Sequence, residues 1–226
     1  MKSIVISHFY NEEYLLPFWL KHHKNIFDHG IMINYGSTDK SCEIVREICP
    51  NWKLVDSENN VFDAVLCDFE VMKYEQNFKG FIKIALNTTE FLCGDHEGLK
   101  KLLQKEKYRN SGIYIPTKVV LPNYKGETVN SNQSLTEQFT KGVFHDDMSL
   151  DSKEKLKLGI VSRNRIIHNC EIGAYSTGRH SSFLSRLFKL SRNNGHAYIA
   201  WFGFAPFSEE TIKRRLQIKK QNSSFR

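Results

Sequence analysis

Residues 1–86 repeat one pattern, in which a short apolar run is followed by a polar turn and then by apolar residues at helical spacing. The runs predict four buried strands, at Lys2–Ser7, Gly30–Asn34, Lys53–Val55 and Phe81–Leu86. The segments between them predict three helices, at Asn11–Phe27, Ser41–Ile48 and Val61–Gln76. Alternating strands and helices with short connections predict an α/β fold with a mostly parallel sheet that is covered by helices on both faces.

The second half of the chain has a less regular pattern. Its predicted elements are a helix at Glu97–Lys105, a long strand at Gly112–Leu121, a loop at Pro122–Ser134, a strand at Ala197–Phe202 and a helix at Ser208–Lys220. We expect one domain over residues 1–221, with a frayed tail at residues 222–226.

Composition fits a soluble globular protein. The chain has 226 residues, of which 40% are hydrophobic and 25% are charged. No apolar run reaches the roughly 18 residues that a membrane span needs, and the N-terminus does not resemble a secretory signal, so we expect a cytoplasmic protein. Its five cysteines form no C-x-x-C pair, which predicts free thiols rather than disulfides or a zinc site.

The chain is basic, with 32 Lys and Arg against 25 Asp and Glu, a net charge of +7. Part of the excess lies near the C-terminus, at Lys213, Arg214, Arg215, Lys219, Lys220 and Arg226. Such a segment suits a phosphorylated ligand, a nucleic acid or an anionic membrane surface, and it is equally typical of a solvated helix face. No nucleic-acid-binding motif accompanies it.

The segment Ile82–Leu92 is the most informative, because an apolar strand ends there in the polar sequence Asn87-Thr88-Thr89-Glu90. Ligands of open α/β sheets bind beyond the carboxyl ends of the strands, where these oxygen-bearing side chains could hold a nucleotide, a sugar or a metal ion. The alternative is a strand followed by an ordinary helix N-cap.

Two other predicted strands also end in polar loops, at residues 7–13 and 34–39. In a parallel sheet, all three loops meet at one edge, and each precedes a helix whose N-terminus favours anions. Glu12 and Asp39 can accept hydrogen bonds from a base or a ribose, and Gly36 allows the backbone to turn close to a ligand.

In order and spacing, these motifs resemble those of GT-A glycosyltransferases, especially the family-2-like group. The matching residues are Asn11-Glu12, the sequence Trp19-Leu20-Lys21-His22-His23, the loop Asn34–Asp39, the metal motif at Asn87–Phe91 and Gly178-Arg179-His180. The resemblance covers residues 1–95 well and residues 160–220 thinly. The chain also looks similar to glycosyltransferase domains that chlorella viruses encode.

The resemblance implies transfer of a sugar from a UDP-sugar donor to a glycan or glycoprotein acceptor, with a nucleotide-binding half at about 1–95 and an acceptor half at about 96–221. Nucleotide contacts are implied for Tyr10, Asn11, Glu12, Asn34, Gly36, Ser37, Asp39, Asn87, Thr88 and Thr89. Glu90 and His180 would hold Mn²⁺ or Mg²⁺, which would stabilise the negative charge of the leaving diphosphate.

The metal motif departs from the family, because Asn87 and Thr89 stand where the family has aspartates. Three outcomes remain open: Glu90 and His180 bind the metal with the phosphates, the metal is weakly bound or dispensable, or the chain is a non-catalytic sugar-nucleotide-binding module. A basic domain that associates with nucleic acid is a further alternative.

Several other segments are candidates. Asp95-His96 could supply the base for the acceptor hydroxyl, or could simply begin a helix. His145-Asp146-Asp147 has the residue types of a metal or base site, and Arg163 and Arg165 could pair with phosphate. The aromatic run Trp201–Phe207 could be an acceptor platform or a lid over the core.

Overall fold

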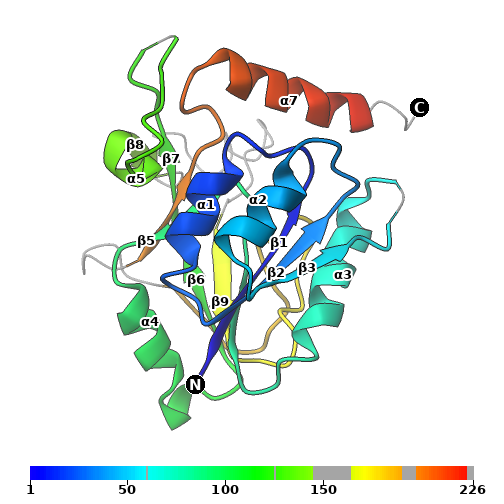
Figure 1. The fold of residues 1–226 in the computed structure, drawn as a ribbon. Helices are drawn as coiled ribbons and strands as arrows, with labels where there is room; N and C mark the ends of the chain where they lie inside the picture. Colours follow the sequence, from blue (N-terminus) through cyan, green and yellow to red (C-terminus); the bar gives the residue numbers. More distant parts are fainter. Residues whose placement is uncertain (60, 125, 145–163, 190–196, 223–226) are drawn as a thin grey trace, which may run out of the picture.

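The structure is a computed structural model, and it describes residues 1–59, 61–124, 126–144, 164–189 and 197–222. The predicted class is confirmed: a central, mostly parallel sheet carries helices on both faces (Figure 1). The strands of the first half are β1 (Ser3–Phe9), β2 (His29–Asn34), β3 (Lys53–Asp56) and β4 (Ile82–Ala85), and the helices between them are α1 (Leu16–His23), α2 (Ser41–Ile48) and α3 (Ala64–Glu75).

The main sheet has seven strands in the order β10-β6-β9-β4-β1-β2-β3. Strands β1 to β4 are parallel wherever they pair, whereas β9 (Arg165–His168) runs antiparallel between β4 and β6 (Gly112–Ile115). Strand β10 (Leu187–Lys189) closes one edge beside β6. A second sheet has the order β5-β11-β7-β8, with β5 at Glu90–Cys93, β11 at Tyr198–Trp201, β7 at Thr117–Val120 and β8 at Gly142–Phe144.

Two predicted elements differ from the structure for local reasons. The long strand Gly112–Leu121 is divided at Pro116 into β6 and β7, which belong to different sheets. Proline lacks the N–H group that a continuous ladder needs. The first helix begins at Leu16 rather than at Asn11, because Asn11 has φ 48° and lies in a turn before the helix.

Alternating residues of the central strands bury both faces of the main sheet. Val5 and Met32 face the core under α1 and α2, while Ile4, Ile6 and Ile31 face the core under α3. Burial on both faces explains why the strands read as continuous apolar runs.

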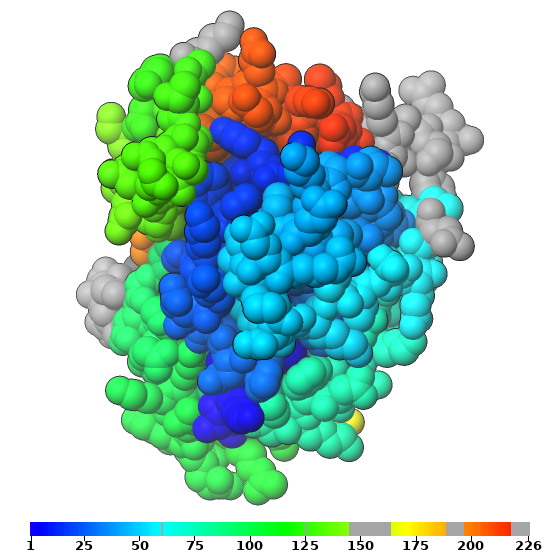
Figure 2. Space-filling model, viewed as in Figure 1, coloured from blue at the N-terminus to red at the C-terminus, as the bar shows by residue number. Residues whose placement is uncertain are grey.

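The remaining helices are α4 (His96–Leu103), the short 3₁₀ helix η1 (Glu106–Tyr108), α5 (Leu135–Gln138) and α7 (Glu209–Asn222). Helix α7 lies across the edge of the main sheet where β1 and β2 end, next to the loops that follow them (Figures 1 and 2). None of the helices within the described ranges is long and apolar enough to cross a bilayer. All five cysteines are free thiols, as the sequence predicted.

Candidate functional site

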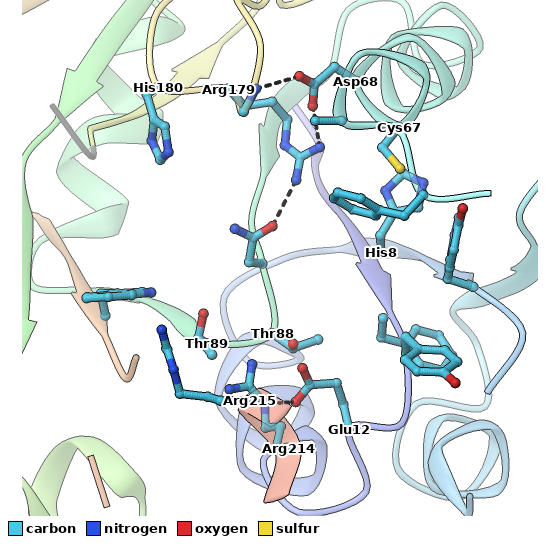
Figure 3. Close-up of a pocket in the computed structure, with 18 of the residues that line it drawn as sticks. His8, Glu12, Cys67, Asp68, Thr88, Thr89, Arg179, His180, Arg214 and Arg215 are labelled. Carbon is cyan, nitrogen blue, oxygen red and sulfur yellow. Dashed lines mark hydrogen bonds and ion pairs between the residues drawn. The ribbon is translucent and has the colours of Figure 1, made fainter. Parts of the chain in front are cut away.

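A cavity of about 660 Å³ opens at the carboxyl ends of β1 and β4, with α3 on one side and α7 on another (Figure 3). Its aromatic lining residues are Phe9, Tyr10, Tyr35, Phe62 and Trp201. Its charged lining residues are Glu12, Asp68, Arg179, Arg214 and Arg215. The cavity therefore combines flat apolar surfaces with guanidinium groups, which suits a ligand that carries both rings and negative charge.

Arg179 projects from a tight turn that α3 holds in place. Asp68 of α3 accepts a hydrogen bond from the Gly178 backbone N–H at 2.7 Å and from Nη1 of Arg179 at 2.6 Å. Nη2 of Arg179 donates to Oδ1 of Asn87 at 2.9 Å. Gly178 and Arg179 both have positive φ, at 83° and 61°. A non-glycine residue in this region is strained, and such strain gathers at functional sites.

Two further arginines reach the cavity from α7. Nε of Arg214 donates to Oε2 of Glu12, which lies in the loop after β1. Nη1 of Arg215 donates to the Gly203 carbonyl at 2.7 Å, and its guanidinium lies 4.8 Å from the centre of the Phe204 ring. Figure 3 shows these two arginines across the cavity from Arg179. The ion pair between Arg214 and Glu12 joins the C-terminal helix to the first loop.

His8, at the end of β1, forms a pair with Glu70 of α3. Nε2 of His8 lies 2.8 Å from Oε2 of Glu70. Burial lowers the pKa of His8, and this outweighs the hydrogen bond to Glu70, which raises it. Burial would raise the pKa of Glu70, but hydrogen bonds from His8, the Glu58 N–H and Ser57 bring it to about 2. A neutral His8 therefore donates through Nε2 to an ionised Glu70.

Arg165 forms a separate, fully paired cluster behind the cavity. Its Nε and Nη2 donate to the two carboxylate oxygens of Glu90 at 2.7 and 2.6 Å. Its Nη1 donates to the Gly178 carbonyl at 2.6 Å and lies 3.2 Å from Nδ1 of His180. A guanidinium has no acceptor, so Nδ1 of His180 accepts, and a neutral His180 carries its proton on Nε2.

These contacts do not fit the divalent cation predicted at Glu90 and His180. Both oxygens of Glu90 accept from Arg165, and Oδ1 of Asn87 accepts from Arg179. The Nε2 atom of a neutral His180 is a donor and has no lone pair for a metal. Within the described ranges, no group of three Asp, Glu, His or Cys side chains could hold a metal ion without a ligand's help. Of the two residues that replace the family's aspartates, Asn87 is paired with Arg179, and the neighbouring Glu90 is paired with Arg165.

Six of the predicted site residues line the cavity. They are Tyr10, Glu12, Asn87, Thr88, Thr89 and His180. Thr88 and Thr89 lie between Arg179 and the two arginines of α7 in Figure 3. The polar sequence after β4 does not begin a helix, because Glu90 starts strand β5 and pairs with Trp201 of β11.

The second polar loop is brought close to the first, but its predicted contact residues do not line the cavity. Asn34 accepts from the Ser37 N–H at 2.8 Å and donates to Asp56 at 2.8 Å. Asp39 accepts from the N–H groups of Ser41 at 2.9 Å and Glu13 at 3.0 Å. These side chains stabilise the loops rather than face the cavity.

Two more predicted residues complete this network. Oδ1 of Asn11 accepts from the Thr38 N–H at 2.7 Å, and Oγ of Ser37 accepts from the Asn11 N–H at 3.0 Å. Gly36, between Tyr35 and Ser37, has φ 72°, a backbone conformation that favours glycine and lets the chain turn there.

Asp95 and His96 also lie outside the cavity lining. Asp95 is the N-cap of α4 and accepts from the Gly98 N–H at 2.8 Å, which is the helix start that the sequence offered as the alternative. The predicted site at His145-Asp146-Asp147, together with Arg163 and residues 223–226, lies outside the described residues.

Several lining residues were not singled out from the sequence as site residues: His8, Tyr35, Cys67, Asp68 and Arg179. Arg179 could have been found, because it is the middle residue of the Gly178-Arg179-His180 motif. Arg214 and Arg215 were noticed only as part of a basic segment. Asp68 gave no signal, since an acidic residue within a helix is ordinary.

Comparisons with known proteins leave the family of this chain open. No family model matches the sequence, and no curated protein matches it. Among solved structures, the chain is similar to glucosyl-3-phosphoglycerate synthase from Mycobacterium tuberculosis, which was solved with Mn²⁺, UDP and glucosyl-3-phosphoglycerate, at 15% identity and a TM-score of 0.36, over 52% of this chain and 44% of that one.

It is also similar to HddC from Yersinia pseudotuberculosis, at 10% identity and a TM-score of 0.43, over 97% of this chain and 100% of that one. A third similar structure is residues 1–349 of S. aureus TarS with UDP, at 16% identity and a TM-score of 0.42, over 88% of this chain and 60% of that one. The chain thus spans less than half of the glucosyl synthase. Similarities at such low identity and TM-score do not establish an activity for this chain.

Proposed function

We propose that this protein transfers a sugar from a nucleoside-diphosphate sugar, with UDP as the nucleotide, to a glycan or glycoprotein hydroxyl. The observation that carries the proposal is a single cavity at the carboxyl ends of β1 and β4 that holds both aromatic and guanidinium groups. The resemblance of the sequence motifs to GT-A glycosyltransferases supports the same conclusion.

The aromatic side chains suit the uracil and sugar rings. Tyr35 and Phe62 lie with ring centres 6.2 Å apart in an edge-to-face arrangement, and both line the cavity. Trp201 and Phe204 form a second such pair at 5.3 Å. Aromatic faces stack on planar bases and on the apolar faces of sugars, and guanidinium forks match phosphate oxygens.

The transfer forms a bond between the acceptor hydroxyl oxygen and the anomeric carbon. The bond between that carbon and the phosphate oxygen breaks, its electron pair leaves with the diphosphate, and the hydroxyl proton passes to water. The chain's own contribution is to hold the donor in place and to stabilise the charge of the leaving diphosphate.

The test measures UDP release from a panel of UDP-sugars, with and without a mixture of glycan acceptors. We expect release that depends on one sugar and increases with acceptor. Thermal unfolding with UDP should show a raised midpoint, because a ligand that binds only the folded state stabilises it. No stabilisation by UDP or by any UDP-sugar would contradict the proposal.

A second candidate is a sugar-nucleotide-binding module without turnover. It is favoured by the absence of the predicted base from the cavity, because Asp95 caps α4 instead. Stabilisation by UDP without any UDP release over long incubation would select this candidate.

A further inference from the structure

The cavity contains buried donors whose hydrogen-bonding capacity is not used. Nε of Arg179 and Nη1 of Arg214 are buried and have no hydrogen-bond partner in the part of the chain that the structure describes. The two residues are only 6% and 8% exposed, and both line the cavity. A buried N–H group without an acceptor costs free energy, so a ligand with acceptor oxygens would recover that cost.

Both arginines are held in place before any ligand arrives. Asp68 binds Nη1 of Arg179 at 2.6 Å, and Glu12 binds Nε of Arg214. Nη2 of Arg179 also donates to Asn87, so the donor that remains without a partner among the described residues is Nε in Arg179 and Nη1 in Arg214. A planar, always charged group that presents several donors in a fixed fork is well suited to phosphate oxygens.

Two of the positions that would bind a metal in the resembling family, Asn87 and Glu90, are hydrogen-bonded to arginines instead. Asn87 accepts from Arg179 rather than offering its oxygen to a cation. Glu90 is paired with Arg165 through both oxygens. Positive charge at this end of the cavity is therefore supplied by side chains.

We propose that Arg179 and Arg214 bind the diphosphate of the donor directly and take the place of a divalent cation, an inference that rests on the proposed function of the same cavity. The diphosphate lies between the turn at Gly178 and helix α7, so that both guanidiniums stabilise the charge that develops on the leaving group. Donor binding is then independent of Mn²⁺ and Mg²⁺.

The experiment is titration calorimetry of the whole chain with UDP, once in EDTA and once in Mn²⁺. We expect the two dissociation constants to agree within about threefold. UDP binding that appears only with Mn²⁺, or that Mn²⁺ tightens by more than about tenfold, would overturn the inference and leave the proposed function standing. Binding of neither UDP nor uridine to the wild type would overturn both.

Charge-neutral double variants test the two arginines without leaving a buried carboxylate unpaired. Asp68→Asn with Arg179→Gln, and Glu12→Gln with Arg214→Gln, should each weaken UDP binding by about tenfold to a hundredfold, as expected for a charge-assisted hydrogen bond. Uridine, which has no phosphate, should bind each variant as it binds the wild type. Equal losses for UDP and uridine would show that the arginines only maintain the cavity, and would overturn the inference.

Arg109→Gln is the matched control, because the Arg109 side chain is 76% exposed, pairs with Glu106 at the surface and does not line the cavity. It should leave UDP binding unchanged. If a double variant fails to unfold cooperatively, Arg179→Lys replaces it: it keeps the charge, loses the fork, and should still weaken UDP relative to uridine. An unchanged ratio of UDP to uridine affinity in Arg179→Lys would then count against the inference.

Discussion

Arg165 and Arg179 are both buried guanidiniums beside the Gly178 turn, yet they differ in how completely they are paired. Every nitrogen of Arg165 has an acceptor, supplied by Glu90, the Gly178 carbonyl and His180. Arg179 has acceptors for its two terminal nitrogens, but its Nε has none among the described residues. Arg165 therefore has no nitrogen without an acceptor, whereas Arg179 keeps one, and this difference is the basis of the proposed diphosphate contact.

The difference extends to neighbouring side chains. The Glu90 side of the site is closed off, with Trp19 donating to the Glu90 carbonyl at 2.8 Å and the Asn87 N–H donating to its carboxylate at 2.8 Å. On the cavity side, His8 Nδ1 and Tyr35 Oη are also buried without a partner in the described chain. Among the described residues, four of the six buried side-chain atoms without a partner belong to residues that line the cavity, and the other two are Nδ1 of His168 and Oε1 of Gln217.

The largest expected effect is that of Arg165→Met on stability. This change leaves the Glu90 carboxylate buried without its counter-charge, and breaking a buried ion pair from one side typically costs about 3–5 kcal/mol. Urea unfolding at neutral pH measures the loss. The double change Glu90→Gln with Arg165→Met should recover part of it, because no buried charge then remains. A loss below about 1 kcal/mol would show that this pair is no more structural than a surface one.

The sequence predicted the first half of the fold well, because its signals are local. Strands buried on both faces read as apolar runs, and Ser41–Ile48 has the predicted bounds. The second half depends on pairing between distant segments. Strand β9 lies between β4 and β6 in the sheet, and no local pattern indicates that neighbours so far apart in sequence will pair.

The site was predicted less well for a related reason. The positions of the polar loops follow from strand order, but the direction of each side chain depends on partners that the sequence does not reveal. Glu90 has the residue type of a metal ligand, and only the contact with Arg165, far along the chain, shows that its oxygens are used. Likewise, Arg214 reads as a solvated residue of a basic helix until its contact with Glu12 is known.

The pH dependence of stability should sharpen the comparison, because His8 titrates on the cavity side. Its folded pKa is lowered by burial and by the charge of Arg179, although Glu70 and Asp68 act in the opposite direction. A histidine with a lowered folded pKa takes up protons more readily when unfolded. Its contribution is therefore complete above about pH 6.5 and is lost as the pH falls toward the folded value. We expect the free energy of unfolding to decrease from pH 7 to pH 5.

The matched variant is His8→Gln, whose free energy of unfolding should change less between pH 7 and pH 5 than that of the wild type. The pH dependence that remains in this variant comes from His22 and His23, whose pKa values are also lowered by burial. Glu70, with a pKa of about 2, loses its contribution only at lower pH, between about 4.5 and 2. Denaturant titrations at several pH values separate the two ranges. A wild type whose stability rises from pH 7 to pH 5 would contradict the assignment of buried neutral histidines.

The smallest expected effect is that of Asp39→Ala. This change tests whether the loop that contains Asp39 is structural, like the Arg165 cluster, or binds the ligand, like the residues of the cavity. Both oxygens of Asp39 accept from backbone N–H groups, so the change should cost about 1 kcal/mol, as for the loss of a helix cap. UDP affinity should stay within about threefold of the wild type, because Asp39 does not line the cavity. Thermal unfolding and UDP calorimetry on the same samples measure both quantities. If Asp39→Ala abolishes UDP binding while the stability is unchanged, then the loop that contains Asp39 binds the uracil base. In that case, a side chain whose hydrogen bonds are all satisfied in the free protein can still bind the ligand, and the comparison between Arg165 and Arg179 loses its meaning.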